Sequence, residues 1–532
     1  MRTFILSLAV SGLLLANNSL ATTTITPTTT LTAQTANNTS TAATFTAQSN
    51  GNIGPSNISK VPTRTLLYPG ATSAIYAHFM AWFGTTYHMD IGYTSSDSAQ
   101  VARQVTDAIS RGISGFILDW YGPGEAMPND TTYVLKSEAE SRQGAFVFAI
   151  MEDGGALSTC HSTAGCDVST QFISDLTYAY NNFEGSPAYM KIGGRPVVFT
   201  FADDRYGTLD WARIAASVPG NPLLIFQDSS GFSHAVSSGS IAWVMINKRN
   251  RNDWGQGYLD NYYATALTFP LEHPYGATYS GFNDTLASWG SNRIMNQNCG
   301  QTWLSTFSEI GKYYGGSKPQ LESLGLVTWN DYEEGTEIES GVDNCVSVAG
   351  AVLGTQLTWN ISGSESTIDH YSVFISGDGE NLMPLADVPA GTHSLDLAGY
   401  GFASGTYTMY VKAVGKPSIK NQMSPAITFL NSKTADFAMS ALPGSKTVSR
   451  GASASYAVTV TPTNGFSGAV SFTLSGLPPH TNASFSPGSV TGSGTSTLTV
   501  MSGPLSTGTY TLTITGTSGT LSHSTKVTLT VQ

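Results

Sequence analysis

Short apolar runs alternate with helix-like stretches between residues 61 and 348. In the stretch 97–111 apolar residues recur at helical spacing, and Asp97 or Ser98 is suited to cap its first turn. The apolar runs have the length and composition of buried strands. There are eight of them, at residues 74–80, 115–119, 145–151, 196–201, 222–227, 241–246, 267–271 and 325–329.

Eight buried strands separated by crossovers over about 290 residues predict a (β/α)8 TIM barrel, which is an α/β fold. A doubly wound open sheet is the main alternative, because it also alternates strands with helices. That fold would place a Gly-rich phosphate loop after its first strand. The chain instead has HFMAW at residues 78–82, so we predict the barrel.

The pattern changes after residue 348. Charged residues become sparse, and short alternating strands are separated by Gly, Ser and Asn turns, which predicts two all-β sandwich domains. Residues 349–432, with the run YTMYVKAV, resemble a fibronectin type III sandwich, and residues 433–532 resemble a bacterial immunoglobulin-like module. Because these segments have few aromatic residues, we expect spacers rather than binding modules.

The first 60 residues lack the barrel pattern. Residues 1–21 combine a basic start, an apolar run and small residues before Ala21, which is typical of a secretory signal peptide. Residues 22–60 are mostly Thr, Ala, Asn, Ser and Gln and predict a linker. No later apolar run reaches the ~18 residues of a membrane span, so we expect an extracellular protein.

Length and charge narrow the class of partner. With 532 residues the chain exceeds one ordinary core, in agreement with a barrel and two smaller domains. Its net charge is −12 and it has no basic run, which disfavours nucleic acid as a partner. We expect a monomer.

Four cysteines are present: Cys160, Cys166, Cys299 and Cys345. An even number in an exported chain favours disulfides. Cys160 and Cys166 are close enough in sequence to close a single loop, so we prefer their pairing and, with it, the pairing of Cys299 with Cys345. A zinc site is the alternative, but no CxxC or HxxxH spacing supports it. We expect neither a metal nor a cofactor.

Polar and aromatic residues stand at the carboxyl ends of seven of the eight predicted strands. In a parallel barrel these strand ends meet on one face, where such folds keep their chemistry. A single buried acid there could simply cap a loop, whereas seven strands with the same feature indicate a site. The residues are His78, Trp82, Asp119, Trp120, Tyr121, Glu152, Asp153, Asp203, Asp204, Gln227, Asp228, Asn247, Asp331 and Glu334.

The densest group of acids follows the last predicted strand. The sequence WNDYEEGTEIE at residues 329–339 carries five acids in nine residues, although only 11% of the chain is charged. An acidic cleft lined by aromatic rings suits a carbohydrate, and cleavage of a glycosidic bond needs two carboxyl groups. No GxSxG, P-loop or HExxH motif points to an esterase, a kinase or a metalloprotease.

Three segments resemble glycoside hydrolase families 71 and 99: YAHFMAWFG, RGISGFILDWYGPG and WNDYEEGTEIE. The resemblance covers residues 63–348 and implies a (β/α)8 enzyme acting on α-linked polysaccharides, α-1,3-glucan in family 71 and α-mannosides in family 99. The last motif combines the two families. Asp331 and Tyr332 match family 71, while residues 334–336 and 338–339 match family 99.

By position, the resemblance implies that Asp331 is the base and that Glu334 is the acid that protonates the leaving oxygen. The base of family 99 is a glutamate that activates the substrate's own 2-hydroxyl, giving retention. Because the residue here is the shorter Asp331, inversion by attack of water is equally open. Glu333 is the rival acid and Glu152 a third candidate, for which we expect a binding role.

Further residues are expected to bind substrate: His78, Trp82, Asp119, Trp120, Tyr121, Glu152, Asn247 and Trp329, the last with core packing as the alternative. The predicted function is endo-acting hydrolysis of α-1,3-glucan or α-mannan. The alternative is a polysaccharide-binding or surface adhesion protein built on an inactive barrel, and glycosyl transfer also stays open.

Overall fold

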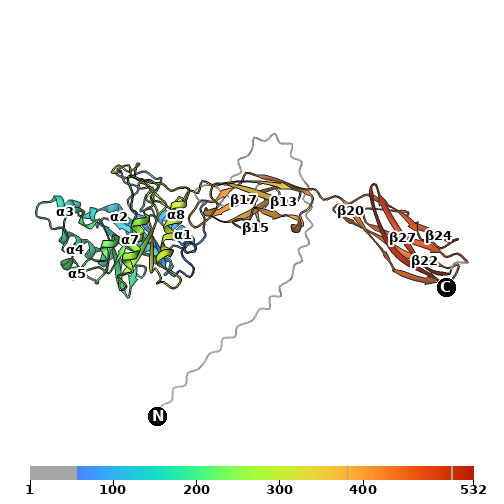
Figure 1. Ribbon diagram of the computed structural model, residues 1–532, viewed down its shortest axis with the longest axis horizontal. Helices are drawn as coiled ribbons and strands as arrows, with labels where there is room; N and C mark the ends of the chain where they lie inside the picture. Colours follow the sequence, from blue (N-terminus) through green and yellow to red (C-terminus); the bar gives the residue numbers. More distant parts are fainter. Residues whose placement is uncertain (1–56, 380, 505–506) are drawn as a thin grey trace, which may run out of the picture. The chain divides into compact units, whose positions relative to one another are not determined.

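A computed structural model describes residues 57–379, 381–504 and 507–532. The predicted signal peptide and most of the predicted linker lie outside these residues. Eight parallel strands form the first fold unit, coloured blue to yellow in Figure 1. They are β1 (Ala74–Met80), β2 (Gly115–Trp120), β3 (Val147–Asp153), β5 (Arg195–Phe201), β6 (Leu223–Gln227), β7 (Gly239–Ile241), β8 (His273–Thr278) and β11 (Ser323–Leu326).

The sheet closes on itself. Each strand pairs in parallel with its neighbour in the order β1, β2, β3, β5, β6, β7, β8 and β11, and β11 pairs back onto β1. A short strand β4 (Lys191–Ile192) adds an antiparallel edge to β5. The predicted TIM barrel is therefore confirmed.

Helices form most of the crossovers. Asp97 caps the first of them, accepting hydrogen bonds from the backbone N–H groups of Ala99 and Gln100 as predicted. The α-helices are α1 (Ser98–Ser110), α2 (Ala126–Ser141), α3 (Ser158–Ser162), α4 (Val168–Ala179), α5 (Trp211–Ser217), α6 (Asp228–Gly231), α7 (Gln256–Ala266) and α8 (Gln301–Tyr313). Short 3-10 or π turns lie at η2 (Thr63–Leu66), η3 (Gly154–Leu157), η4 (Tyr180–Glu184) and η5 (Asp203–Tyr206).

Two strand predictions need correction. The run 267–271 is not a strand: Leu267 caps the end of α7, and Leu271 is 95% exposed in the following turn. The seventh barrel strand is β8. Its sequence, HPYGAT, does not read as a buried strand because it contains a proline and two small residues. The sixth strand, β7, ends at Ile241 instead of extending to residue 246.

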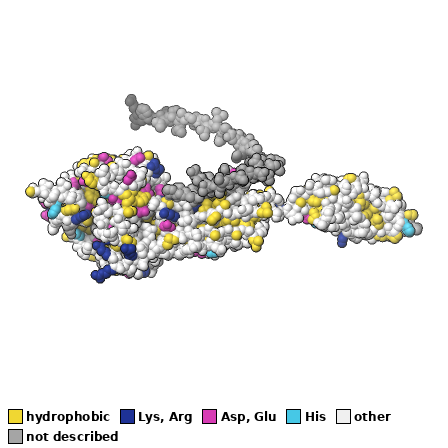
Figure 2. All heavy atoms as spheres, turned by 90° about the horizontal axis from the view of Figure 1, so that it is seen from above, with side chains coloured by type: hydrophobic (Ala, Val, Ile, Leu, Met, Phe, Trp, Pro, Cys, Tyr) yellow, Lys and Arg dark blue, Asp and Glu magenta, His cyan; other side chains and the backbone are white. Residues whose placement is uncertain are grey.

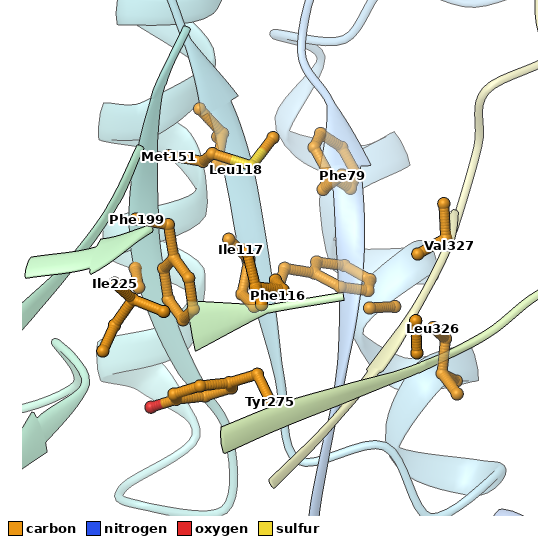
Figure 3. Close-up of a cluster of buried hydrophobic side chains, with 14 of the residues drawn as sticks. Phe79, Phe116, Ile117, Leu118, Met151, Phe199, Ile225, Tyr275, Leu326 and Val327 are labelled. Atoms are coloured by element: carbon orange, nitrogen blue, oxygen red, sulfur yellow. The ribbon is translucent and has the colours of Figure 1, made fainter. Parts of the chain in front are cut away.

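Alternation along each strand separates a barrel interior from an outer face that packs on the helices. Inside the barrel, the rings of Phe199 and Tyr275 meet edge to face, with centroids 4.8 Å apart. On the outer face, Phe116 packs against Phe79 at 5.0 Å. Figure 3 shows both pairs among the buried side chains of the barrel strands. The barrel is thus a packed core, and only its ends can hold a ligand.

One side chain fixes the segment that follows β11. Asn330, fully buried, accepts a hydrogen bond from the backbone N–H of Met80 at 2.8 Å and donates one to the Met80 carbonyl at 3.0 Å. The side-chain amide of Asn330 therefore makes the two hydrogen bonds that a backbone peptide group would make if the pairing of β11 with β1 continued. It holds the acidic segment against the end of β1.

Two sandwiches follow, and charged side chains are visibly sparser on them than on the barrel (Figure 2). The first has sheets β12-β13-β16 and β15-β14-β17-β18 with β19 on β17; the second has β20-β22-β26-β24 and β21-β28-β27-β23-β25. The first comprises β12 (Ser347–Leu353), β13 (Gln356–Ser362), β14 (Ile368–Ser376), β15 (Met383–Pro389), β16 (Ser394–Asp396), β17 (Gly405–Gly415), β18 (Gln422–Met423) and β19 (Ile427–Asn431), with turns η6 (Glu365–Thr367) and η7 (Ala398–Tyr400). The second comprises β20 (Asp436–Leu442), β21 (Ser445–Val448), β22 (Ser453–Thr463), β23 (Ala469–Ser475), β24 (Asn482–Ser486), β25 (Ser489–Thr491), β26 (Gly494–Met501), β27 (Gly508–Ser518) and β28 (Leu521–Val531). The predicted all-β modules are confirmed.

The last residues of the predicted linker are ordered. Ile58 is 4% exposed, and the backbone N–H of Ser59 donates to the carbonyl of Ile419 at 2.9 Å. Residues 58 and 59 at the end of the predicted linker are therefore held against the chain near residue 419, with Ile58 as the buried apolar anchor. Among the residues that the structure describes, no helix is both long and apolar enough to cross a bilayer.

The two predicted disulfides are confirmed. One joins Cys160 to Cys166, six residues apart, and the other joins Cys299 to Cys345, 46 residues apart. The second bond ties the start of α8 to the loop after the acidic segment. It therefore encloses β11 and the acidic segment at residues 331–339.

Replacement of both Cys299 and Cys345 by Ser should lower the free energy of unfolding by about 2 to 4 kcal/mol, because the lost bond closed a long loop in the unfolded chain. The matched control, replacement of Cys160 and Cys166 by Ser, should cost less because its loop is short. Calorimetric unfolding of the two double variants measures the difference. A larger loss in the control would contradict the loop-length explanation.

Candidate active site

Four carboxyl groups lie together at the carboxyl ends of the barrel strands. Asp119 is the second-last residue of β2, Asp153 is the last residue of β3, and Asp331 and Glu334 follow β11. Asp119 is 4% exposed, and burial together with the charges of Asp153, Asp331 and Glu334 raises its pKa well above the ordinary value. The four acids therefore share one electrostatic environment.

A tight turn sets the two acids of the last segment. The backbone N–H of Asp331 donates to the hydroxyl of Thr328 at 2.9 Å. Its carboxylate Oδ1 in turn accepts from the N–H groups of Glu333 and Glu334, at 3.0 and 2.9 Å. Gly335 closes the turn with φ +60°, in the left-handed region that favours glycine. The turn places residues three apart in the same cluster.

The two acids differ in their surroundings. Burial raises the pKa of Asp331, while the two N–H donors on its carboxylate favour the charged form and oppose that rise. Burial and the charge of Asp331 raise the pKa of Glu334, and the guanidinium of Arg293 opposes it. Asp331 is thus better suited to carry negative charge and Glu334 to hold a proton.

Glu333, the rival acid, is engaged elsewhere. Its carboxylate lies 2.8 Å from the His88 Nδ1 and accepts from the backbone N–H of Met89 at 3.0 Å. It is also 2% exposed. These contacts fasten the loop after β1 to the acidic segment, which gives Glu333 a structural task and leaves Glu334 as the candidate acid.

A small hairpin, β9 (Phe282–Asn283) with β10 (Ile294–Met295), holds Glu334 from the other side. The Asn283 N–H donates to the backbone carbonyl of Glu334 at 2.6 Å, and the Arg293 Nη2 lies 3.7 Å from its carboxylate. Fully buried Asp284 orients Arg293 by accepting from its Nε at 2.7 Å and from its backbone N–H at 2.6 Å. Arg293 also stacks on Phe282, 4.9 Å from the ring centre.

Arg293→Gln should move the alkaline limb of the pH–activity profile to higher pH, by up to about one unit, or ~1.4 kcal/mol. Loss of the cation raises the pKa of Glu334 further, so that this carboxyl stays protonated at higher pH. Arg293→Lys keeps the charge and should keep the limb. Initial rates measured across pH for the three proteins test this. An alkaline limb at the same pH in Arg293→Gln and in the parent would show that Arg293 does not set the pKa of the general acid.

Several predicted binding residues lie at or near the four acids. The Tyr121 hydroxyl bonds the carboxylate of Asp153, and its ring meets that of Trp82 edge to face at 6.1 Å. Trp82 in turn stacks on His88 at 5.0 Å. His78 lies deeper in the barrel: it is fully buried against Trp243, and burial lowers its pKa to about 3. His78 therefore supports the floor of the site as a neutral ring.

Three other residues predicted to bind substrate pack away from the four acids, and for Trp329 this is the core packing named above as the alternative. Trp120 stacks on Tyr178 of α4, Glu152 shares a hydrogen bond with Asp175 of α4, and Trp329 packs on Phe116 under the guanidinium of Arg111. Each is fully buried. Alternation along β2 and β3 turns Trp120 and Glu152 toward the helices, whereas Trp329 lies three residues beyond the end of β11.

Asn247 is exposed and lies in a turn, where it donates to Asp253 at 2.9 Å. The structure places no carboxylate of the acidic cluster among its hydrogen-bond partners in the described chain. Asp203 and Asp204 form the start of η5.

Sequence reasoning missed Arg293, Asp284 and His88. Asp284 and Arg293 stand on a hairpin with no strand-like apolar run, and His88 lies within a loop. The isolated triplet FND at residues 282–284 was the only signal.

Within residues 57–379, 381–504 and 507–532, no group of three or more His, Cys, Asp or Glu side chains could hold a metal ion.

Solved structures show only distant similarity. An S-layer protein SbsC fragment with domains 4 and 5 is 17% identical over 32% of this chain and 81% of that one, with a TM-score of 0.17. Bacteroides uniformis beta-glucuronidase 3 is 7% identical over 86% and 62%, with a TM-score of 0.32. The endo-beta-1,4-mannanase from Thermotoga petrophila is 9% identical over 68% and 98%, with a TM-score of 0.30. The chain spans only 23% and 24% of two longer SbsC structures.

No curated protein shows a significant match. The model of Glycosyl hydrolase family 71, by contrast, matches residues 71–341, which is more than half of the chain. The matched range runs from just before β1 to just beyond the acidic segment, and so contains the whole barrel and all four acids. The chain belongs to glycosyl hydrolase family 71, and its barrel is that of a glycoside hydrolase.

Proposed function

We propose that this protein is a secreted, endo-acting hydrolase of an α-linked polysaccharide, with α-1,3-glucan as the first candidate and α-mannan as the second. The observation that carries the proposal is the pair Asp331 and Glu334, two neighbouring buried carboxyls whose surroundings favour opposite protonation states. Two disulfides and the predicted signal peptide support an extracellular location. We assign the reaction to residues 61–348 and a spacer role to residues 349–432 and 433–532.

In the proposed reaction Glu334 starts protonated and donates its proton to the glycosidic oxygen as the bond from that oxygen to the anomeric carbon breaks. Asp331 starts ionised and takes the proton released by the attacking hydroxyl. When that hydroxyl is water, the products are a new reducing end and a new hydroxyl, and one water is consumed. Asp119 and Asp153 complete the acidic cluster, suited to bind sugar hydroxyls.

Two routes fit this pair of residues. If Asp331 activates water, the anomeric configuration inverts in one step. If it activates the 2-hydroxyl of the substrate, attack on the neighbouring anomeric carbon expels the leaving group and gives an intermediate that water then opens with retention; this route requires the 2-hydroxyl to be trans to the leaving group, as in an α-mannoside and not in an α-glucan. The side chain of Asp331 is one methylene shorter than that of glutamate, which favours water, because more room is left between base and sugar.

The experiment incubates the purified protein with α-1,3-glucan and, separately, with α-mannan. Chromatography of the released oligosaccharides identifies the substrate and the mode of cleavage, and NMR of the first products gives their anomeric configuration. Short oligosaccharides of many lengths from α-1,3-glucan, with β configuration at the new end, are the expected result. Tight binding to either polymer without any cleavage would instead favour an adhesion protein.

A further inference from the structure

Two loops beside the acids expose apolar side chains. Tyr87, in the loop after β1, is 84% exposed; Leu286 and Trp289, in the loop between β9 and β10, are 70% and 48% exposed. Both loops follow the carboxyl ends of barrel strands and so lie on the face that carries the acids. Single exposed apolar residues are common on any protein, so their exposure alone indicates nothing.

Their anchoring distinguishes these loops. His88, next to Tyr87, lies 2.8 Å from Glu333, and Met89 donates to the same carboxylate. The hairpin that carries Trp289 is bonded to Glu334 through Asn283 and Arg293. Each aromatic loop is therefore fastened to a residue of the acidic segment itself.

This attachment gives the exposed rings a defined distance from the reacting bond. Buried Asp284 strengthens it by also accepting from the N–H of Ser291 at 3.0 Å, so that both ends of the Trp289 loop converge on one carboxylate. A polymer lying across the acids has to leave the site over neighbouring loops. Flat rings held there can stack on the apolar faces of sugar rings.

We propose that Tyr87 and Trp289 are outer sugar-binding platforms, each stacking on a ring of the polysaccharide beyond the two sugars that flank the cleaved bond. This inference rests on the proposed function and deepens it, because such platforms serve a long chain and not a short oligosaccharide. They would explain why two large rings stay exposed on loops that are otherwise firmly held.

The expected effect is selective for substrate length. Tyr87→Ala and Trp289→Ala should each raise KM for a long soluble α-1,3-glucan by about 2- to 10-fold, with kcat on the shortest cleaved oligosaccharide unchanged. Tyr87→Phe and Trp289→Phe keep a stacking ring and should stay near the parent. Leu271→Ala, which removes an even more exposed apolar side chain ahead of β8, at the opposite end of the barrel, is the matched control.

A second readout avoids catalysis. Affinity electrophoresis through gels containing α-1,3-glucan compares Glu334→Gln with the same protein carrying Tyr87→Ala or Trp289→Ala. Weaker retardation of the two combined variants supports the platforms, even if the parent cleaves nothing and the proposed function fails. Unchanged retardation and unchanged KM on the long glucan overturn the platforms alone. A kcat loss on the short oligosaccharide would also overturn them, since it would assign these residues to positioning the acids.

Discussion

Glu334→Gln is expected to lower kcat on the polymeric substrate by ~10²-fold or more, since the amide cannot give a proton to the leaving oxygen. The substitution preserves size, and the backbone contacts of residue 334 to Asn283 do not involve the side chain. The alkaline limb of the pH profile should disappear with the carboxyl. Because burial and Asp331 raise the pKa of Glu334, that limb in the parent lies above the ordinary carboxyl range.

A substrate that needs no proton separates this role from a general loss of structure. A nitrophenyl glycoside of the same oligosaccharide has a leaving group that departs as the anion. Glu334→Gln should therefore retain most of the parent rate on it. Equal losses on the polymer and on the nitrophenyl substrate would show that Glu334 is not the acid.

Asp331→Asn is expected to lower kcat by ~10²-fold or more on both substrates, because the attacking hydroxyl must lose its proton whichever group leaves. An asparagine Oδ1 can still accept from the N–H groups of Glu333 and Glu334, so the turn should persist. The acidic limb of the profile, set by ionisation of Asp331, should vanish. In the parent it should lie above pH ~4, because burial raises the pKa of this carboxyl.

The comparison of the two variants on the two substrates is more informative than either alone. Rescue of Glu334→Gln but not of Asp331→Asn by the nitrophenyl group would fix which residue is acid and which is base. The reverse pattern would exchange the roles. Thermal unfolding of both variants controls for folding, and a midpoint near that of the parent is expected.

The barrel was predictable because its buried strands are continuous apolar runs. The prediction was wrong at the seventh strand, where pairing with the neighbouring strands outweighs the apolar pattern of the sequence. The apolar run 267–271 lies in a turn with Leu271 exposed, whereas HPYGAT is buried as β8 because its neighbours on both sides supply the pairing. A proline and a glycine in a buried strand cannot be recognised without those partners.

The sequence predicted which strand ends form the site, but it did not predict which side chains at those ends face the site. Sequence places Asp119 beside Trp120 and Glu152 beside Asp153, yet adjacent strand residues face opposite sides. A single residue of register decides which one reaches the cleft. Arg293 was out of reach for another reason, since its role depends on a hairpin that returns to Glu334 from 41 residues earlier.

Release of reducing ends from α-1,3-glucan by the parent protein and by the double variant Asp331→Asn with Glu334→Gln tests the central claim most directly. The parent should release oligosaccharides steadily, and the folded double variant should release them at least ~10²-fold more slowly. A parent that cleaves neither α-1,3-glucan nor α-mannan, or a double variant as active as the parent, would contradict the account.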